Sequence, residues 1–483
     1  MRDTAGAPIS AAQVAASPNV RAFTDSLGRF ALTGLAPGAH RVRVSRIGYR
    51  HRDTTLVLHD GDDVVLDVTL TPVPNLFPGE PTPREEAEAE AAIAAAGQID
   101  SIGDGLLHQD TTRTLSYRAF GERFLFAAIA AQGADSTTVV SPVSAATALS
   151  LLWMGARDST AAAIGRVLGL GALSRTAVGA GNAALMDGLD HRSDVVLDMG
   201  NAVWVSPWTT LRDEFKRLAS ADYRTVIARV PLDQPAAVTA INHWVDSVTR
   251  GKIPEMLTRP LDARASMYLA NAVYFKGKWM APFRKSQTRD RDFTLTGGQR
   301  VRVPMMERVG RYGYRQEPGY RLLRLPYRGG RVAMYIVLPD SGVLPVDLAR
   351  RMNQSGWPAF EGVVPRPMVH VVLPKFHVEQ QLDLGRLLSS LGMGIAFDPD
   401  RADFGDLARD TRGDGLAITR ATQKVYIDVD EEGTVAAAAT GVEVGVTSVP
   451  PPPIPFIVDR PFVFLLRDEV SGADLFAGWI AHP

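Results

Sequence analysis

The segment from Gly433 to Val449 restricts the fold of this chain more than any other. It reads GTVAAAATGVEVGVTSV, with one charge, no proline and no side chain larger than valine except Glu443. Four consecutive prolines follow at residues 450–453, and they cannot continue a β ladder. Such a segment either packs as a strand or forms a loop.

Alternate residues of this segment differ in what they could bury. One face of a strand would carry only small or β-branched side chains, and the other would carry the single charge. The first set is Thr434, Ala436, Ala438, Thr440, Val442, Val444 and Val446, and the second is Val435, Ala437, Ala439, Gly441, Glu443, Gly445 and Thr447. The pattern fits a strand with one buried face, but an ordinary core strand or an Ala/Gly-rich loop would look the same.

Composition excludes several classes of function. The chain has 483 residues, 46% hydrophobic and 22% charged, which is enough for a large core. A net charge of -1 gives no electrostatic footprint for nucleic acid, and the absence of cysteine excludes thiol catalysis and disulfides. The nine histidines show no metal-ligand spacing, and the sequence has no G-x-S-x-G, H-E-x-x-H or P-loop motif. We therefore expect no metal, no cofactor and no nucleic-acid partner.

We recognise no targeting signal and no membrane-spanning segment in the sequence. Its longest weakly polar stretch, Val143 to Ala156, is too short to cross a bilayer, so we expect no membrane partner. The first 25 residues lack the apolar core of a signal peptide. Met1 falls inside what should be the first strand of the N-terminal domain, so we expect the start to be truncated. Seven lysines against 45 arginines favour a GC-rich bacterial genome.

The first 72 residues are predicted to form short strands and turns. Val68 and Leu70 alternate with Asp67 and Thr69, in a pattern that begins at Val64, and the sequence RVRV at residues 41–44 alternates in the same way. The stretch TDSLGRFALTGLAPGAHRVRVSRIGY resembles the carboxypeptidase regulatory-like (prealbumin-like) β-sandwich, an all-β domain. Prolines and an acidic run then predict a linker over residues 73–113, and residues 114–483 are expected to form one domain.

The sequence around the small-residue segment resembles the serpin family. The residues DEEGTVAAAAT, beginning at Asp430, are similar to the hinge of an inhibitory serpin's reactive loop. Other matching blocks occur in chain order, namely SPVSAA at 141–146, NAVYFKGKW at 271–279, VPMM at 303–306, LPKF at 373–376, RPFVFL at 460–465 and LFAG at 475–478. The resemblance covers the whole predicted large domain. It implies the α+β serpin fold, in which helices pack around three β-sheets and a reactive-centre loop is exposed.

The resemblance also assigns roles to particular residues. The implied hinge consists of Glu431, Gly433, Thr434, Ala436, Ala437, Ala438 and Ala439. The implied breach, the point at which the loop would enter the sheet, lies above Trp279. The implied shutter, a polar cluster that controls opening of the sheet, consists of Asn271, Ser141, Ser144 and Gln423. Many serpins have histidine where this chain has Gln423. Glutamine can still donate and accept hydrogen bonds, so opening remains possible while a pH-sensitive contribution is lost. Counting from the hinge places the reactive bond at Thr447–Ser448, within about two residues.

The function implied is that of a suicide-substrate inhibitor, not an enzyme. A serine protease would attack the exposed loop, which is expected to include Thr434 in the intact protein, and form a covalent acyl complex. The freed hinge would then enter the central sheet as a new strand. No Lys or Arg occurs from Val425 to Asp459, so we expect elastase-like or subtilisin-like targets and not trypsin-like ones.

The resemblance leaves one alternative, a non-inhibitory serpin that acts as a binding or storage protein. Such members commonly carry bulky, charged or proline residues in the hinge, and the four consecutive alanines here favour the inhibitor. We expect a monomer that is extracellular or periplasmic.

Overall fold

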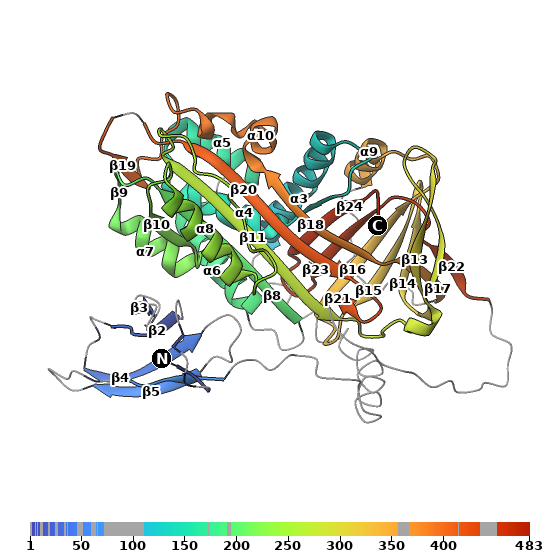
Figure 1. Cartoon of the computed structure of the whole chain (residues 1–483), viewed down its shortest axis with the longest axis horizontal. Helices are drawn as coiled ribbons and strands as arrows, with labels where there is room; N and C mark the ends of the chain where they lie inside the picture. The colour runs from blue at the N-terminus through green and yellow to red at the C-terminus, as the bar shows by residue number, and fades with distance from the viewer. Residues whose placement is uncertain are drawn as a thin grey trace. The chain divides into compact units, whose positions relative to one another are not determined.

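A computed structural model describes two parts of the chain (Figure 1). The first comprises portions of residues 2–71, and the second is residues 111–483 without 172, 191–194, 356–366, 414 and 435–451. The chain divides into two compact units, Met1–Pro78 and Gly79–Pro483. The linker predicted over residues 73–113 lies outside the described residues except at its end, where a helix has already begun at Thr111.

The N-terminal unit is built from strands in the residues described. They are β1 (Arg2–Asp3), β2 (Gln13–Ser17), β3 (Val20–Phe23), β4 (Gly38–Ser45), β5 (Arg52–Leu58) and β6 (Thr69–Leu70). Four form a sheet in the order β3-β2-β4-β5, and β1 pairs with β6. Val42 and Val44 of the predicted alternating strand are fully buried, as predicted. The second predicted alternation is seen at Val68 and Leu70, which are buried, whereas Val64 is 47% exposed.

The large unit contains both helices and strands. The helices are α3 (Thr111–Gln132), α4 (Pro142–Gly155), α5 (Asp158–Leu168), α6 (Arg175–Asp190), α7 (Asp213–Asp222), α8 (Pro235–Val248), α9 (Pro345–Ser355), α10 (Leu384–Leu388) and the shorter η1 (Lys285–Gln287), η2 (Ser389–Met393) and η3 (Gly394–Phe397). The strands are β7 (Thr138–Val140), β8 (Val195–Val205), β9 (Thr209–Leu211), β10 (Val226–Arg229), β11 (Met267–Lys278), β12 (Arg289–Thr294), β13 (Arg300–Arg311), β14 (Gly313–Glu317), β15 (Tyr320–Pro326), β16 (Val332–Pro339), β17 (Met368–Pro374), β18 (Phe376–Asp383), β19 (Ala408–Asp410), β20 (Ile418–Val429), β21 (Gly433–Thr434), β22 (Ile454–Ile457), β23 (Phe462–Asp468) and β24 (Asp474–Ile480).

Three large sheets organise these strands. The central sheet has the order β10-β8-β11-β21-β20-β18, the second has the order β12-β13-β17-β22, and the third has the order β14-β15-β16-β23-β24-β7. A two-stranded ribbon joins β19 to β9. The strands β16, β23 and β24 are buried along their whole length, which explains their continuous apolar sequences.

Helices cover both faces of the central sheet. Helix α4 is apolar or small on all sides, and every residue of it except Trp153 is buried, because a helix without a polar face must be enclosed. It packs on one face of β11, where Leu269 belongs to the same core. Helix α8 packs on the opposite face, where Trp244 clusters with Tyr268 and Ala270. Side chains alternate across β11, so odd-numbered residues face α4 and even-numbered ones face α8.

The two long strands at the centre of this sheet, β11 and β20, run parallel and pair directly (Figure 1). Their register joins Met267 to Ile418 at one end and Tyr274 to Tyr426 at the other, and we call this ladder the seam. Beyond the seam, the short β21 lies between them and is antiparallel to both. Parallel pairing is slightly less stable per residue than antiparallel pairing, so the seam is a weak place in the sheet.

Candidate functional site

Strand β20 turns back on itself to start β21. The backbone N–H of Asp430 donates to the carbonyl of Gly433 at 2.8 Å. The Oδ1 atom of Asp430 accepts from the backbone N–H groups of Glu432 (2.9 Å) and Gly433 (3.2 Å). Gly433 has φ +150°, and a Cβ there would lie 2.0 Å from the carbonyl oxygen of Gly277. Only glycine can therefore bring the turn this close to β11.

The predicted hinge begins inside the sheet. Thr434 has no exposed surface, and its Oγ1 lies 2.7 Å from the hydroxyl of Tyr327. Glu431 is also buried. The expectation that Thr434 is exposed in the intact protein is wrong, because β21 already occupies the space between β11 and β20. Its side chain does point inward, as expected for the first residue of the uncharged face.

The rest of the predicted hinge and the reactive bond cannot be placed. Ala436, Ala437, Ala438, Ala439, Thr447 and Ser448 lie outside the described residues.

Trp279 hydrogen-bonds to the turn that joins β20 to β21. Its indole Nε1 donates to the carbonyl of Asp430 at 3.0 Å, and its backbone N–H donates to the carbonyl of Glu432 at 2.8 Å. Its ring stacks on Tyr327 with centroids 4.4 Å apart. Phe283 adds a backbone hydrogen bond to the carbonyl of Glu431. The residue assigned to the breach therefore holds the start of the hinge in place.

The carboxylates of the turn have opposite electrostatic environments. Glu431 accepts from Lys375 Nζ and Thr288 Oγ1, both at 2.8 Å. Burial opposes its ionisation, but these hydrogen bonds outweigh burial and lower the pKa of Glu431. For Asp430 burial dominates, helped by the nearby Glu432 carboxylate, and its pKa is raised to about 6. Glu432 itself pairs with Lys285 at 2.9 Å.

Replacing Asp430→Asn should remove a pH dependence of stability. A carboxyl whose folded pKa lies above its unfolded value of about 3.9 favours the folded state when protonated, so its ionisation reduces stability as pH rises from about 4 to about 6. Asparagine keeps the Oδ1 acceptor without the charge. We expect Asp430→Asn to unfold at a higher temperature than the wild type at pH 7.5, with the difference shrinking towards pH 4.

The control is Asp428→Asn, which changes a partly buried carboxylate on the same strand. Thermal unfolding from pH 4 to 8 is the measurement. A constant difference between Asp430→Asn and the wild type across this range would contradict the assignment.

A cluster of hydrogen-bonded polar side chains holds the two strands of the seam together. Asn271 lies opposite Gln423 across the seam and opposite Asn201 on β8. Gln423 Nε2 donates to Asn271 Oδ1 at 2.7 Å, and Asn271 Nδ2 donates to Ser144 Oγ at 2.5 Å and to Asn201 Oδ1. Gln423 also accepts from the backbone N–H of Ser141 at 2.8 Å and donates to its carbonyl at 3.0 Å. The structure thus brings together the four residues that sequence analysis assigned to the shutter.

Sequence analysis missed one member, Asn201. Its only signal is an amide within the otherwise mostly apolar run VVLDMGNAVWV at 195–205, and only the strand register shows that it faces Asn271. All the cluster side chains are amides or hydroxyls that do not titrate. Separating β11 from β20 would break the Gln423–Asn271 hydrogen bond.

Truncation of Gln423→Ala should destabilise the closed sheet. It leaves the buried N–H of Ser141 and the Oδ1 of Asn271 without this partner, and each unsatisfied buried group costs about 1–3 kcal/mol. We expect a loss of about 2–4 kcal/mol, measured by denaturant unfolding. The matched control is Gln381→Ala on the neighbouring β18, where the exposed amide makes one 3.3 Å bond to a backbone carbonyl. Equal losses of unfolding free energy in the two variants would show that the shutter hydrogen bonds do not contribute specially to stability.

The described part of the chain contains no cluster of three or more His, Cys, Asp or Glu residues placed to hold a metal ion. None of its helices is long and apolar enough to cross a membrane.

Comparison with known proteins gives the class of this chain. The family model described as Serpin (serine protease inhibitor) matches residues 117–483. The model of the carboxypeptidase regulatory-like domain matches residues 1–71. The chain belongs to the serpin family and carries an N-terminal carboxypeptidase regulatory-like domain. Both family resemblances found in the sequence are confirmed, while the domain boundaries at residues 72 and 113 stay predictions.

Similar proteins come from plants and animals. Serpin-Z1C of Triticum aestivum is 34% identical over 370 residues, which is 73% of this chain and 91% of that protein. Neuroserpin of Gallus gallus is 32% identical over 364 residues, with coverages of 72% and 87%.

Solved structures agree in fold. Serpin48 of the insect Tenebrio molitor aligns with a TM-score of 0.68 at 30% identity, over 78% of this chain and 99% of that one. The thermophilic serpin tengpin in its native state aligns with a TM-score of 0.69 at 26% identity, over 78% and 96%. The α+β serpin fold expected from the sequence is confirmed.

Proposed function

We propose that this protein inhibits serine proteases as a suicide substrate, by inserting its cleaved loop into the central sheet. The observation that carries the proposal is β21, a two-residue strand already held between β11 and β20 directly above their seam. Insertion then only lengthens a strand that has begun.

The register of β21 predicts where each loop residue would go. Thr434 pairs with Gly277 on one side and Val429 on the other. Continuing this antiparallel register puts residue 436 between Phe275 and Ile427, both fully buried, and residue 437 between Tyr274 and Tyr426 on the opposite face. Residue 440 would enter between Asn271 and Gln423. A small side chain is needed at 436, and Thr440 brings a hydroxyl to the polar cluster.

The free energy that drives trapping of the protease comes from replacing one strand pairing in the central sheet with two. Insertion replaces the parallel seam with two antiparallel ladders and adds on the order of ten hydrogen bonds at ~0.5–1.5 kcal/mol each. The sum, about 10 kcal/mol, is comparable with the stability of a whole domain. The intact protein is therefore kinetically trapped, and cleavage by the protease releases the trap. The moving strand drags the acylated protease away and distorts its active site before hydrolysis.

The insertion step is tested by two neighbouring alanines given the same substitution. Ala436→Glu would place a carboxylate between Phe275 and Ile427, where desolvation costs several kcal/mol. Ala437→Glu would place it on the opposite face, where Lys276 and the charges of Arg250 and Lys252 lie close together. We expect Ala436→Glu to be cleaved as a substrate and Ala437→Glu to inhibit.

The readout is the stoichiometry of inhibition together with the ratio of covalent complex to cleaved protein on denaturing gels. Equal trapping by both variants would show that this segment does not insert with the face that includes Thr434 inward.

We further propose Thr447–Ser448, within about two residues, as the reactive bond and an elastase-like or subtilisin-like enzyme as the target. The support is the absence of Lys and Arg from Val425 to Asp459, together with the small side chains at the bond. The inhibitor is proposed to act as a monomer outside the cytoplasm, and the bacterial origin favoured by arginine usage stays a prediction. It forms a covalent complex with its target and catalyses no reaction of its own.

Target choice is tested with trypsin, elastase and subtilisin. Elastase and subtilisin should give complexes that survive denaturation, and trypsin should not. The peptide released on cleavage should begin at Ser448 or within two residues of it by mass spectrometry. Rapid stoichiometric inhibition of trypsin alone would contradict the bond assignment. Cleavage by every enzyme without complex would favour the alternative function, that of a binding or storage serpin.

A further inference from the structure

Positive charge is concentrated in one segment of this nearly neutral chain. From Arg284 to Arg321 there are ten basic and four acidic residues, a net of +6, although the whole chain has a net charge of -1. The segment contains η1, β12, β13, β14 and the start of β15. Some of these charges are paired, for example Lys285 with Glu432 and Arg315 with Glu317.

One end of this segment reaches the chain that follows the reactive loop. In the sheet β13-β17-β22, Val309 lies opposite His370, and His370 lies opposite Pro455. Two strand spacings separate Val309 from Pro455, roughly 10 Å. Arg321 Nη1 donates to the carbonyl of Pro455 at 3.2 Å, and its guanidinium lies 5.8 Å from the ring centre of Phe456.

The other end of the segment supports the start of the loop. Thr288 donates to Glu431, and Lys285 pairs with Glu432. The segment therefore contacts the chain on both sides of the reactive loop. An enzyme that attacks this loop must come close to its surface.

The exposed part of the segment has the composition of a protein interface. Val309 is 47% exposed, and Arg311 is exposed on the same side of β13, two residues further on. Arg289, which is also exposed, donates to the backbone carbonyls of Ser286 and Thr288, and these bonds do not neutralise its charge. Arginine beside an apolar side chain is typical of protein–protein interfaces, in which Arg is enriched and Lys depleted.

We propose that this surface, made of Arg289, Val309, Arg311 and Arg321, is a docking site for the target protease and selects one with an acidic surface beside its active site. The inference rests on the proposed function and adds a second criterion of target choice to the residues at the reactive bond. Charge complementarity would raise the association rate constant and leave the fate of the acyl complex unchanged.

The test uses two subtilisin-like proteases of the same pocket preference, one acidic and one basic in net charge. Each is used active and with its catalytic serine replaced by alanine, so that docking is measured without cleavage. We expect the acidic enzyme to associate at least tenfold faster at 0.05 M salt, with most of this advantage lost at 0.5 M, where charges are screened.

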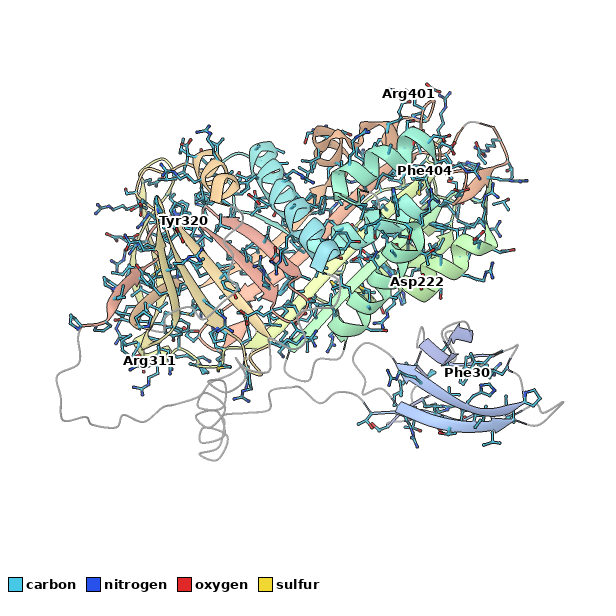
Figure 2. All side chains as sticks on the ribbon, turned by 180° about the vertical axis from the view of Figure 1, so that it is seen from behind. Phe30, Asp222, Arg311, Tyr320, Arg401 and Phe404 are labelled. Carbon is cyan, nitrogen blue, oxygen red and sulfur yellow. The ribbon has the colours of Figure 1, made fainter. Side chains whose placement is uncertain are left out.

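Charge reversal gives the residue-level test. Arg311→Glu and Arg289→Glu should each slow association of the acidic enzyme about fivefold and speed that of the basic enzyme, and a misfolded variant could not give that gain. The control is Arg401→Glu, whose side chain is 68% exposed at the opposite end of the same unit, as Figure 2 shows for Arg311 and Arg401. The stoichiometry of inhibition should not change in any variant.

Four outcomes decide the proposal. The expected pattern of rates supports it. Equal rates for both enzymes, or equal effects at Arg311 and Arg401, overturn it even if covalent trapping occurs. Acceleration of both enzymes by dextran sulfate, lost in Arg311→Glu, also overturns it and identifies a polyanion site. Salt-dependent docking of the inactive enzymes without covalent trapping by the active ones would support the docking site but reject the proposed inhibitory function.

Discussion

The parallel ladder between β11 and β20 is the contact on which the proposed loop insertion depends. It joins two strands that would each form a better ladder with an antiparallel partner, and β21 already supplies the first residues of such a partner. The fold thus keeps a less stable pairing next to the beginning of a more stable one. In the proposed mechanism, the energy needed to open the seam separates the closed sheet from the inserted state, and the hydrogen bond between Gln423 and Asn271 is one part of that energy.

The structure separates control of the seam from control of the hinge. The cluster at the seam consists of amides and hydroxyls, so its hydrogen bonds do not change with protonation between pH 4 and 8. The turn at Asp430 does titrate, because burial raises the pKa of that carboxyl to about 6. A change of pH would therefore act on the turn that starts β21 and leave the hydrogen bonds of the seam cluster unaffected.

The sequence predicted the fold through short blocks along the large domain, and the site through the residues in those blocks. Ser141, Ser144, Asn271 and Gln423 could be named in advance but not connected, because the contacts depend on the pairing of strands far apart in the chain. Asn201 belongs to none of the recognised blocks and is located only by its register with Asn271. The alternation beginning at Thr434 predicted that this side chain would be the first on an inward face, and it is buried. It could not show that Thr434 is already buried in the intact chain, because a pattern of side chains does not specify how far the strand extends into the sheet.

The small strand β22 bears on how far an uncut loop could be inserted under the proposed mechanism. A loop inserted as far as Met267 would carry residue 444 roughly 34 Å down the sheet, at ~3.4 Å per residue. The ten residues from there to Ile454 span at most about 36 Å when fully extended, and the prolines among them, at ~3.1 Å per residue, shorten that reach. Insertion of the uncut loop that far would therefore pull on β22, where Phe456 is completely buried and Arg321 holds the carbonyl of Pro455. In the proposed mechanism, insertion without cleavage is thus opposed by the anchoring of this distant strand, as well as by the sheet that receives the loop.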